Sequence, residues 1–178
     1  MIDVEKAWIE TASGGQFHIL EPRQDEILIT DIGHALGMLC RFTGHCRRFY
    51  SVAEHSVHAS RLVPEDDALW ALMHDSSEAY ISDVNSPMKH FTDVGVTYKR
   101  VEAKVMKAIC KKFGLPVEQP QSVHEVDMAM LYAEKDQIMS ALPWSDKGKS
   151  ADVKIRCWSP DVAKSMFLTR FYELTGQI

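Results

Sequence analysis

The stretch from residue 69 to residue 78 reads Leu-Trp-Ala-Leu-Met-His-Asp-Ser-Ser-Glu, and it ends an apolar run with two adjacent polar side chains. The apolar spacing predicts a helix packed into a core, so His74 and Asp75 are expected at its inner end. A carboxylate in such a place costs free energy unless a partner compensates its charge. A metal ion would be such a partner.

A metal ion needs further ligands, and two other segments with helical apolar spacing can supply them. His55 lies in Ser-Val-Ala-Glu-His-Ser at 51–56, and Asp127 lies in Val-His-Glu-Val-Asp-Met-Ala at 123–129. Imidazoles combined with carboxylates suit transition metals better than calcium. We therefore predict one divalent transition metal (Zn, Co or Mn, with Mg as an alternative) held by His55, His74, Asp75 and Asp127. A rival pair, His55 with His58, would leave His74 and Asp75 unexplained.

Composition sets the broad class of the protein. The chain has 178 residues, of which 46% are hydrophobic and 25% charged, so we expect one globular domain spanning 1–178. With a net charge of −5 and no lysine or arginine run, no nucleic-acid polymer is expected as a partner. No apolar run approaches the roughly 20 residues of a membrane span. The four cysteines match no zinc motif, and the first residues do not look like a signal peptide. We therefore expect a cytoplasmic protein with reduced thiols.

The pattern along the chain predicts an all-α fold with a minor N-terminal β element. Short strands are expected at 16–20 and 26–29, and the segment 81–91 is expected to be irregular. Ser51-Val52-Ala53-Glu54 is expected to form a capping box, in which the Ser and Glu side chains each bond a free backbone N–H at the helix start. Helices are expected at 30–39, from 51 to about 62, from 64 to the His74-Asp75 pair, at 96–113, from 122 to about 141, and from 159 to near 176.

The ordered set His55, His74-Asp75 and Asp127 resembles the HD-domain metal-dependent phosphohydrolases, over about residues 41–139. Within that family the chain is most similar to bacterial 5′-deoxynucleotidases and phage dATP triphosphohydrolases. The narrower match is carried by Arg41-Phe42, residues 51–56, residues 74–78, Asp83, residues 86–89 and Asp127. The resemblance implies a compact helical bundle with a central metal, a small-molecule nucleotide as substrate, and a homo-oligomer.

The resemblance also implies roles for further residues. Glu78, four residues after His74 and so on the same helical face, would orient water or transfer a proton, and Asp83 would position the water or protonate the leaving oxygen. Arg41 and Lys89 would contact phosphate. Phe42 would pack on the nucleoside, although the family often has tryptophan there.

The expected reaction is attack by metal-bound hydroxide on the 5′ (α) phosphorus of a nucleotide, releasing nucleoside plus phosphate or triphosphate. The short chain favours a phage-type deoxynucleotide triphosphohydrolase, acting for example on dATP. A 5′-deoxynucleotidase acting on monophosphates is the alternative, and a non-catalytic nucleotide-binding HD module is a further one. HD proteins that hold two irons carry extra histidines after the His-Asp pair, where this chain has Ser76, Ser77 and Glu78, which favours a single metal. The HD enzymes that cleave cyclic dinucleotides or (p)ppGpp are another alternative.

Overall fold

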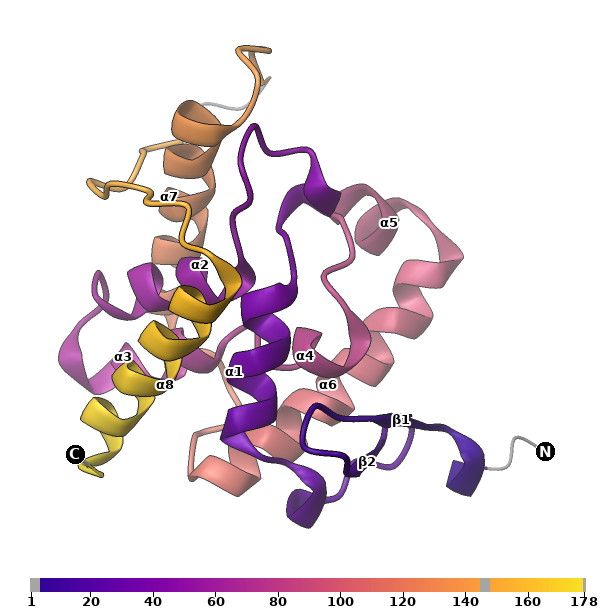
Figure 1. Cartoon of the computed structure of the whole chain (residues 1–178). Coiled ribbons are helices and arrows are strands. Elements are labelled where there is room, and N and C mark those ends of the chain that lie inside the picture. The colour runs from indigo at the N-terminus through magenta and orange to yellow at the C-terminus, as the bar shows by residue number, and fades with distance from the viewer. Residues whose placement is uncertain (1–3, 145–147, 178) are drawn as a thin grey trace.

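The computed structural model describes residues 4–144 and 148–177, which are mostly helical (Figure 1). A two-stranded antiparallel hairpin near the N-terminus pairs β1 (Trp8–Glu10) with β2 (Gln16–His18). The helices are α1 (Ile29–Met38), α2 (Val52–Ser60), α3 (Ala68–Met73), α4 (Glu78–Ile81), α5 (Ser86–Phe91), α6 (Asp93–Phe113), α7 (Gln121–Ile138) and α8 (Pro160–Thr175). None of the described helices is both long and apolar enough to cross a membrane.

Helix α2 lies at the centre of the fold. All nine of its residues are buried, and it packs against α1, α3, α7 and α8. A helix buried on every face is usually apolar all round. Here, however, Glu54, His55 and His58 lie inside the protein, so their polar atoms require partners there. The fold thus places a histidine of the predicted metal site in the interior.

The C-terminal segment covers α2 from one side. Phe167 and Phe171 of α8 belong to the main core cluster, and α8 packs along α1 and α2 (Figure 1). Just before α8, the buried carboxylate of Glu54 accepts hydrogen bonds from three successive backbone N–H groups, those of Arg156 (2.7 Å), Cys157 (2.9 Å) and Trp158 (2.6 Å). The start of α8 is therefore tied to the central helix.

Several sequence expectations are confirmed. The fold is mostly helical with a small β element, the long helix ends at Gly114 in a left-handed conformation (φ 72°), and the last helix begins after Ser159 and ends at Gly176. The capping box is only half formed: Ser51 Oγ accepts from the Glu54 N–H at 3.1 Å. The Glu54 side chain bonds residues 156–158 and does not reach back to the helix start.

Two expectations for local structure are wrong. The strand expected at 26–29 is a short 3-10 turn leading into α1, and the partner of Gln16–His18 is Trp8–Glu10. The segment 81–91 is not irregular throughout, because α5 forms within it. Asn85 caps this helix by accepting from the Met88 N–H at 3.1 Å, and Pro87 occupies the first turn, where its missing N–H costs nothing.

Candidate metal centre

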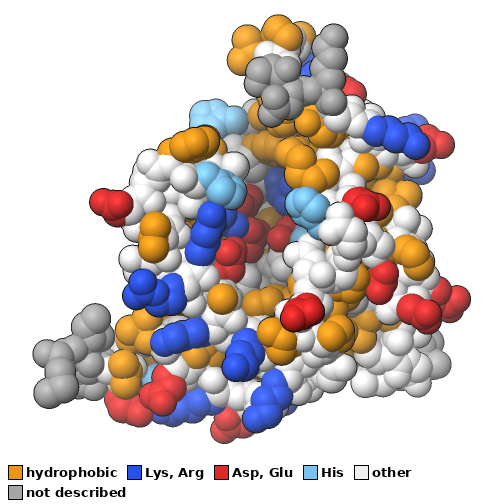
Figure 2. Space-filling view, turned by 180° about the vertical axis from the view of Figure 1, so that it is seen from behind, with side chains coloured by type: hydrophobic (Ala, Val, Ile, Leu, Met, Phe, Trp, Pro, Cys, Tyr) orange, Lys and Arg blue, Asp and Glu red, His pale blue; other side chains and the backbone are white. Residues whose placement is uncertain are grey.

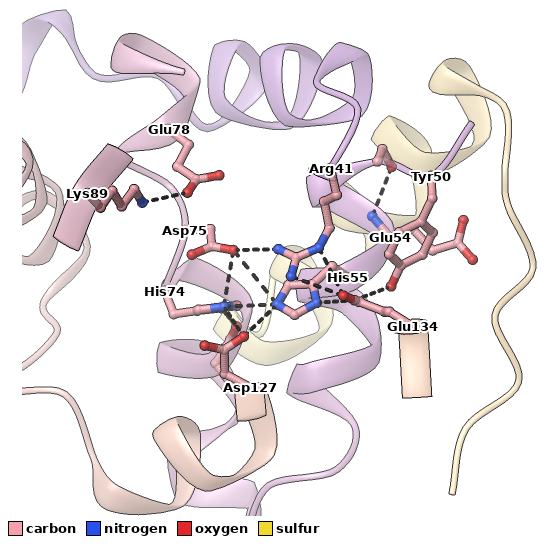
Figure 3. A network of polar contacts seen from close by, with 12 residues as sticks. Arg41, Tyr50, Glu54, His55, His74, Asp75, Glu78, Lys89, Asp127 and Glu134 are labelled. Atoms are coloured by element: carbon pink, nitrogen blue, oxygen red, sulfur yellow. Dashed lines mark hydrogen bonds and ion pairs between the residues drawn. The ribbon is translucent and has the colours of Figure 1, made fainter. Parts of the chain in front are cut away.

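Three helices bring the four predicted ligands together (Figure 3). His55 comes from the middle of α2, His74 and Asp75 from the end of α3, and Asp127 from α7. The His55 and His74 Nε2 atoms are 3.1 Å apart; Asp127 Oδ1 lies 3.2 Å from His55 Nε2, and Asp75 Oδ2 lies 3.2 Å from His74 Nε2. One donor atom each from His55, His74 and Asp75 lie within 4.8 Å of one another. These residues could therefore hold a metal ion.

In each imidazole, Nδ1 is held by an acceptor outside the cluster, and this leaves Nε2 facing the cluster. His74 Nδ1 lies 2.7 Å from the backbone oxygen of Ala71, and His55 Nδ1 lies 2.5 Å from Glu134 Oε1. Both partners are acceptors, so each Nδ1 donates a hydrogen bond away from the centre and each Nε2 faces the carboxylates of Asp75 and Asp127. Metal-binding histidines are held in the same way, with the far nitrogen donating to a carboxylate or a carbonyl. A metal that displaced the Nε2 protons would meet one lone pair from each ring.

Glu134 is a buried carboxylate that bonds His55 and also Arg41 and Tyr50. Glu134 Oε2 accepts from Arg41 Nη2 (3.1 Å) and Nε (3.2 Å), and Glu134 Oε1 also accepts from the Tyr50 hydroxyl (2.9 Å). Burial alone would raise the pKa of Glu134, but Arg41 and His55 lower it below its usual value. Arg41 Nη1 also approaches Asp75 Oδ2 at 3.4 Å. Arg41 therefore links Glu134 to a predicted ligand.

The carboxylates of the site differ in their tendency to ionise. Burial would raise the pKa of Asp75 and of Asp127, yet the two histidines hold both well below the usual range. Glu78 is the opposite case: burial, then the charges of Asp75 and Asp83, raise its pKa well above the usual value despite nearby Lys89. Its Oε2 atom is buried and has no hydrogen-bond partner among the described residues. Glu78 thus holds a proton more readily than an ordinary glutamate does.

A cleft of about 670 Å³ opens onto the cluster, a size typical of small-molecule sites. Asp75 and Asp127 form part of its wall, together with every residue predicted for catalysis or substrate contact, namely Arg41, Phe42, Glu78, Asp83 and Lys89. Leu131, Met139 and Trp144 add an apolar side. Figure 2 shows a hollow with acidic side chains in its depth and with histidine and basic side chains around its rim.

No family model matches the chain, but comparison with known proteins finds relatives of similar sequence. It is 35% identical to the uncharacterised protein YfdR of Escherichia coli, over 95% of this chain and 96% of YfdR. The chain belongs to the YfdR family. It is also 30% identical to an uncharacterised protein of Rhodobacter capsulatus, over 76% of this chain and 74% of that protein.

In this YfdR-family protein the regular helix is interrupted at the predicted ligand pair. Residues 74–77 form a turn, in which the Glu78 N–H bonds the Asp75 carbonyl at 3.0 Å, and Glu78 begins the new helix α4. Glu78 therefore does not share a continuous helix with His74, as the four-residue spacing had suggested. Helix α4 ends at Ser82, whose φ of 69° lies in the left-handed region that non-glycine residues rarely adopt. Asp83 follows directly and reaches the cleft.

Other predicted residues have partners within this YfdR-family fold. Lys89 Nζ lies 3.4 Å from Glu78 Oε1 (Figure 3). It also lies 3.1 Å from Glu102 Oε1, so its charge is already paired at the cleft wall. The rival ligand pair is wrong, because His58 faces Glu54 (3.4 Å) and the ring of Trp158 and lies outside the ligand cluster.

The sequence reasoning missed Glu134 and Trp144. Glu134 comes seven residues after Asp127, two helical turns on, and therefore on the same face of α7. That spacing of two carboxylates was a usable signal. Trp144 follows the end of α7 and had no pattern to assign it to the cleft.

Proposed function

We propose that this protein is a metal-dependent phosphohydrolase of the HD-domain type, which hydrolyses nucleotides at the 5′ (α) phosphorus. The observation that carries the proposal is the pair of imidazole Nε2 atoms 3.1 Å apart, flanked by Asp75 and Asp127 at the wall of a ligand-sized cleft. A divalent metal bound there would lower the pKa of a water molecule and polarise a phosphoryl oxygen.

Glu78 and Asp83 are suited to move the protons of this reaction. Glu78 has a buried oxygen without a partner and a raised pKa, so it can take a proton from the attacking water. Burial also raises the pKa of Asp83. A carboxyl that stays protonated more readily can donate to the leaving 5′-oxygen. Lys89 holds Glu78 in place through its 3.4 Å contact.

Arg41 and Phe42 are suited to hold the nucleotide. Arg41 orients Glu134 and Asp75, and its guanidinium also lines the cleft, where a positive charge favours a phosphate group. Phe42, Leu131, Met139 and Trp144 also line the cleft. An aromatic and aliphatic wall of this kind can pack against a nucleobase and sugar.

The test is hydrolysis of ribo- and deoxynucleoside monophosphates and triphosphates with Mn²⁺, Co²⁺, Zn²⁺ and Mg²⁺ in turn, with products separated by chromatography. We expect release of nucleoside, and at least a roughly 100-fold lower rate for Glu78→Gln, the range typical of a lost proton-transfer group. His74→Ala should lose activity with every metal, and the exposed-residue variant Glu118→Gln should not. Tight nucleotide binding without turnover under all four metals would instead make the protein a non-catalytic binding module.

A further inference from the structure

Two cysteines lie at the two ends of one short loop, residues 41–45. Cys40 precedes the loop, where it pairs with Ser51 in an isolated antiparallel bridge, and Cys46 follows the loop. The cleft of about 670 Å³ is lined by four of the five loop residues, namely Arg41, Phe42, Thr43 and His45. A chemical change at the two cysteines would therefore act on one wall of this cleft.

The two thiols are close enough to react with each other. The Cys46 thiol lies within hydrogen-bonding distance of the Cys40 thiol. Its Sγ atom also donates to the backbone oxygen of Arg41, the residue next to Cys40, at 3.3 Å. Both cysteines are free and partly exposed. Two thiols that meet in this way can form a disulfide when a small oxidant reaches one of them.

The backbone of the loop is held in an uncommon conformation. Phe42 and Thr43 both have a φ of 54°, in the left-handed region that non-glycine residues rarely adopt, and Gly44 has a φ of 80°. Such a conformation persists only while surrounding contacts hold it. The Arg41 carbonyl supplies two of these contacts, since it accepts from the Gly44 N–H at 3.1 Å and from the Cys46 thiol. Oxidation of the thiol would remove the second contact.

We propose that Cys40 and Cys46 are a site of reversible oxidation by glutathione disulfide, and that the intramolecular disulfide they form changes the conformation of residues 41–45 in the cleft wall. In the first step the Cys40 thiolate attacks one sulfur of glutathione disulfide and displaces a glutathione thiolate. The Cys46 sulfur then attacks the Cys40 sulfur of this mixed disulfide and displaces the second glutathione. The protein loses two hydrogens, and its two electrons reduce one glutathione disulfide to two glutathione molecules.

The surroundings of Cys46 set the order of the two attacks. Burial, and then the neighbouring Cys40 thiol, raise the pKa of Cys46 to about 12, so Cys46 is a slow first nucleophile. Once Cys40 has reacted, it carries no charge, and one cause of the raised pKa is gone. A dithiol whose thiolate is not stabilised also favours the disulfide at equilibrium.

The test begins with wild-type protein in glutathione buffers of increasing disulfide content. The remaining thiols are then blocked with N-ethylmaleimide, and the protein is digested with trypsin. Trypsin cleaves after Arg41, between the two cysteines, so a disulfide from Cys40 to Cys46 joins the peptides 24–41 and 42–47. We expect mass spectrometry to find this joined pair in place of the two blocked peptides, and dithiothreitol to separate it.

Two variants show which cysteines take part. Cys157→Ser removes another partly exposed cysteine and should still form the joined peptides. Cys46→Ser should stop at a glutathione adduct on Cys40. A disulfide that joins Cys157 to either cysteine, adducts without a disulfide in the wild-type protein, or thiols that stay unmodified at the highest disulfide content would each overturn the proposal.

Amide hydrogen exchange measures the response of the loop. The Gly44 and His45 N–H groups bond the carbonyls of Arg41 and Phe42, so their exchange reports on the loop conformation. Exchange in residues 41–45 should differ between the oxidised and reduced wild-type protein, and not in Cys40→Ser/Cys46→Ser treated in the same way. Unchanged exchange in the oxidised wild-type protein overturns the conformational part. Neither measurement uses nucleotide turnover, so the result is independent of the proposed function.

Discussion

Glu134 shows how a single side chain can set the properties of a site it does not enter. It bonds His55 Nδ1 at 2.5 Å, the Tyr50 hydroxyl at 2.9 Å and Arg41 Nη2 at 3.1 Å, and it is fully buried. Through these contacts it fixes the orientation of the His55 ring and neutralises Arg41. Its negative charge makes the lone pair of His55 Nε2 a stronger donor to a metal.

Replacing Glu134 should weaken metal binding without removing a ligand. For Glu134→Gln we expect a loss of metal affinity of about 10–100-fold, the usual effect of removing the partner of a ligand histidine. Titration with Co²⁺ by calorimetry, well below the unfolding temperature of the variant, measures it. Glu125→Gln, an exposed change on the same helix, is the control. An affinity equal to wild type in folded Glu134→Gln protein would contradict this role.

At the scale of elements, α2 has two functional sides carried by neighbouring residues. His55 faces the predicted ligand cluster (Figure 3). The Glu54 carboxylate bonds the backbone of residues 156–158. Successive residues of a helix point about 100° apart, so one buried turn can serve both. The turn between α3 and α4 is a second such element, because the predicted ligands His74 and Asp75 lie at its start and Glu78 follows its end.

Loss of the Glu54 charge should destabilise the fold. In Glu54→Gln, three backbone N–H groups lose a charged acceptor in the interior, and we expect about 2–4 kcal/mol less stability. For a chain of this length that corresponds to a fall in unfolding temperature on the order of 10 °C. Thermal unfolding followed by circular dichroism measures it, with exposed Glu65→Gln as the control. A change below about 0.5 kcal/mol would be inconsistent with the three bonds.

The sequence predicted elements with local signals and missed those set by distant contacts. Gly114, Ser159 with Pro160, and Gly176 mark helix ends by their own backbone preferences, so these boundaries were predicted. The direction of the Glu54 side chain depends on a segment about 100 residues away, and the true partner of β2 depends on how the hairpin packs. Local sequence patterns indicate neither the direction of the Glu54 side chain nor the strand that pairs with β2.

The candidate site also contains residues that local sequence patterns predict and residues that only distant contacts bring together. The residues predicted as ligands come together because each lies on the inner face of an apolar helical segment, which periodicity reveals. Glu134 and the pairing of Lys89 with Glu102 arise from the packing of α5, α6 and α7 around the cleft. The left-handed backbone at Ser82 has no sequence signal, since glycine is the residue expected there.

At the scale of the whole molecule, the predicted ligands come from α2, α3 and α7, so a metal bound to them would join three helices. A metal that binds only the folded state stabilises it by about 2.7 kcal/mol at 100 times its dissociation constant. We therefore expect Mn²⁺ or Co²⁺ to raise the unfolding temperature by roughly 5–10 °C and a chelator to reverse the shift. The shift should vanish in Asp127→Asn and persist in Glu118→Gln. Equal shifts in all of these proteins would mean that the ions act elsewhere.

The three hydrogen bonds from residues 156–158 to Glu54 determine how much of the chain must be kept together in a fragment. The segment that resembles HD-domain proteins stops near residue 139. A fragment ending there would leave the Glu54 carboxylate buried without the three N–H donors of residues 156–158. It would also strip Phe167 and Phe171 from the core beneath α1 and α2. The unit that must fold together is therefore longer than this segment, because residues 156–158 bond Glu54, the neighbour of the predicted ligand His55.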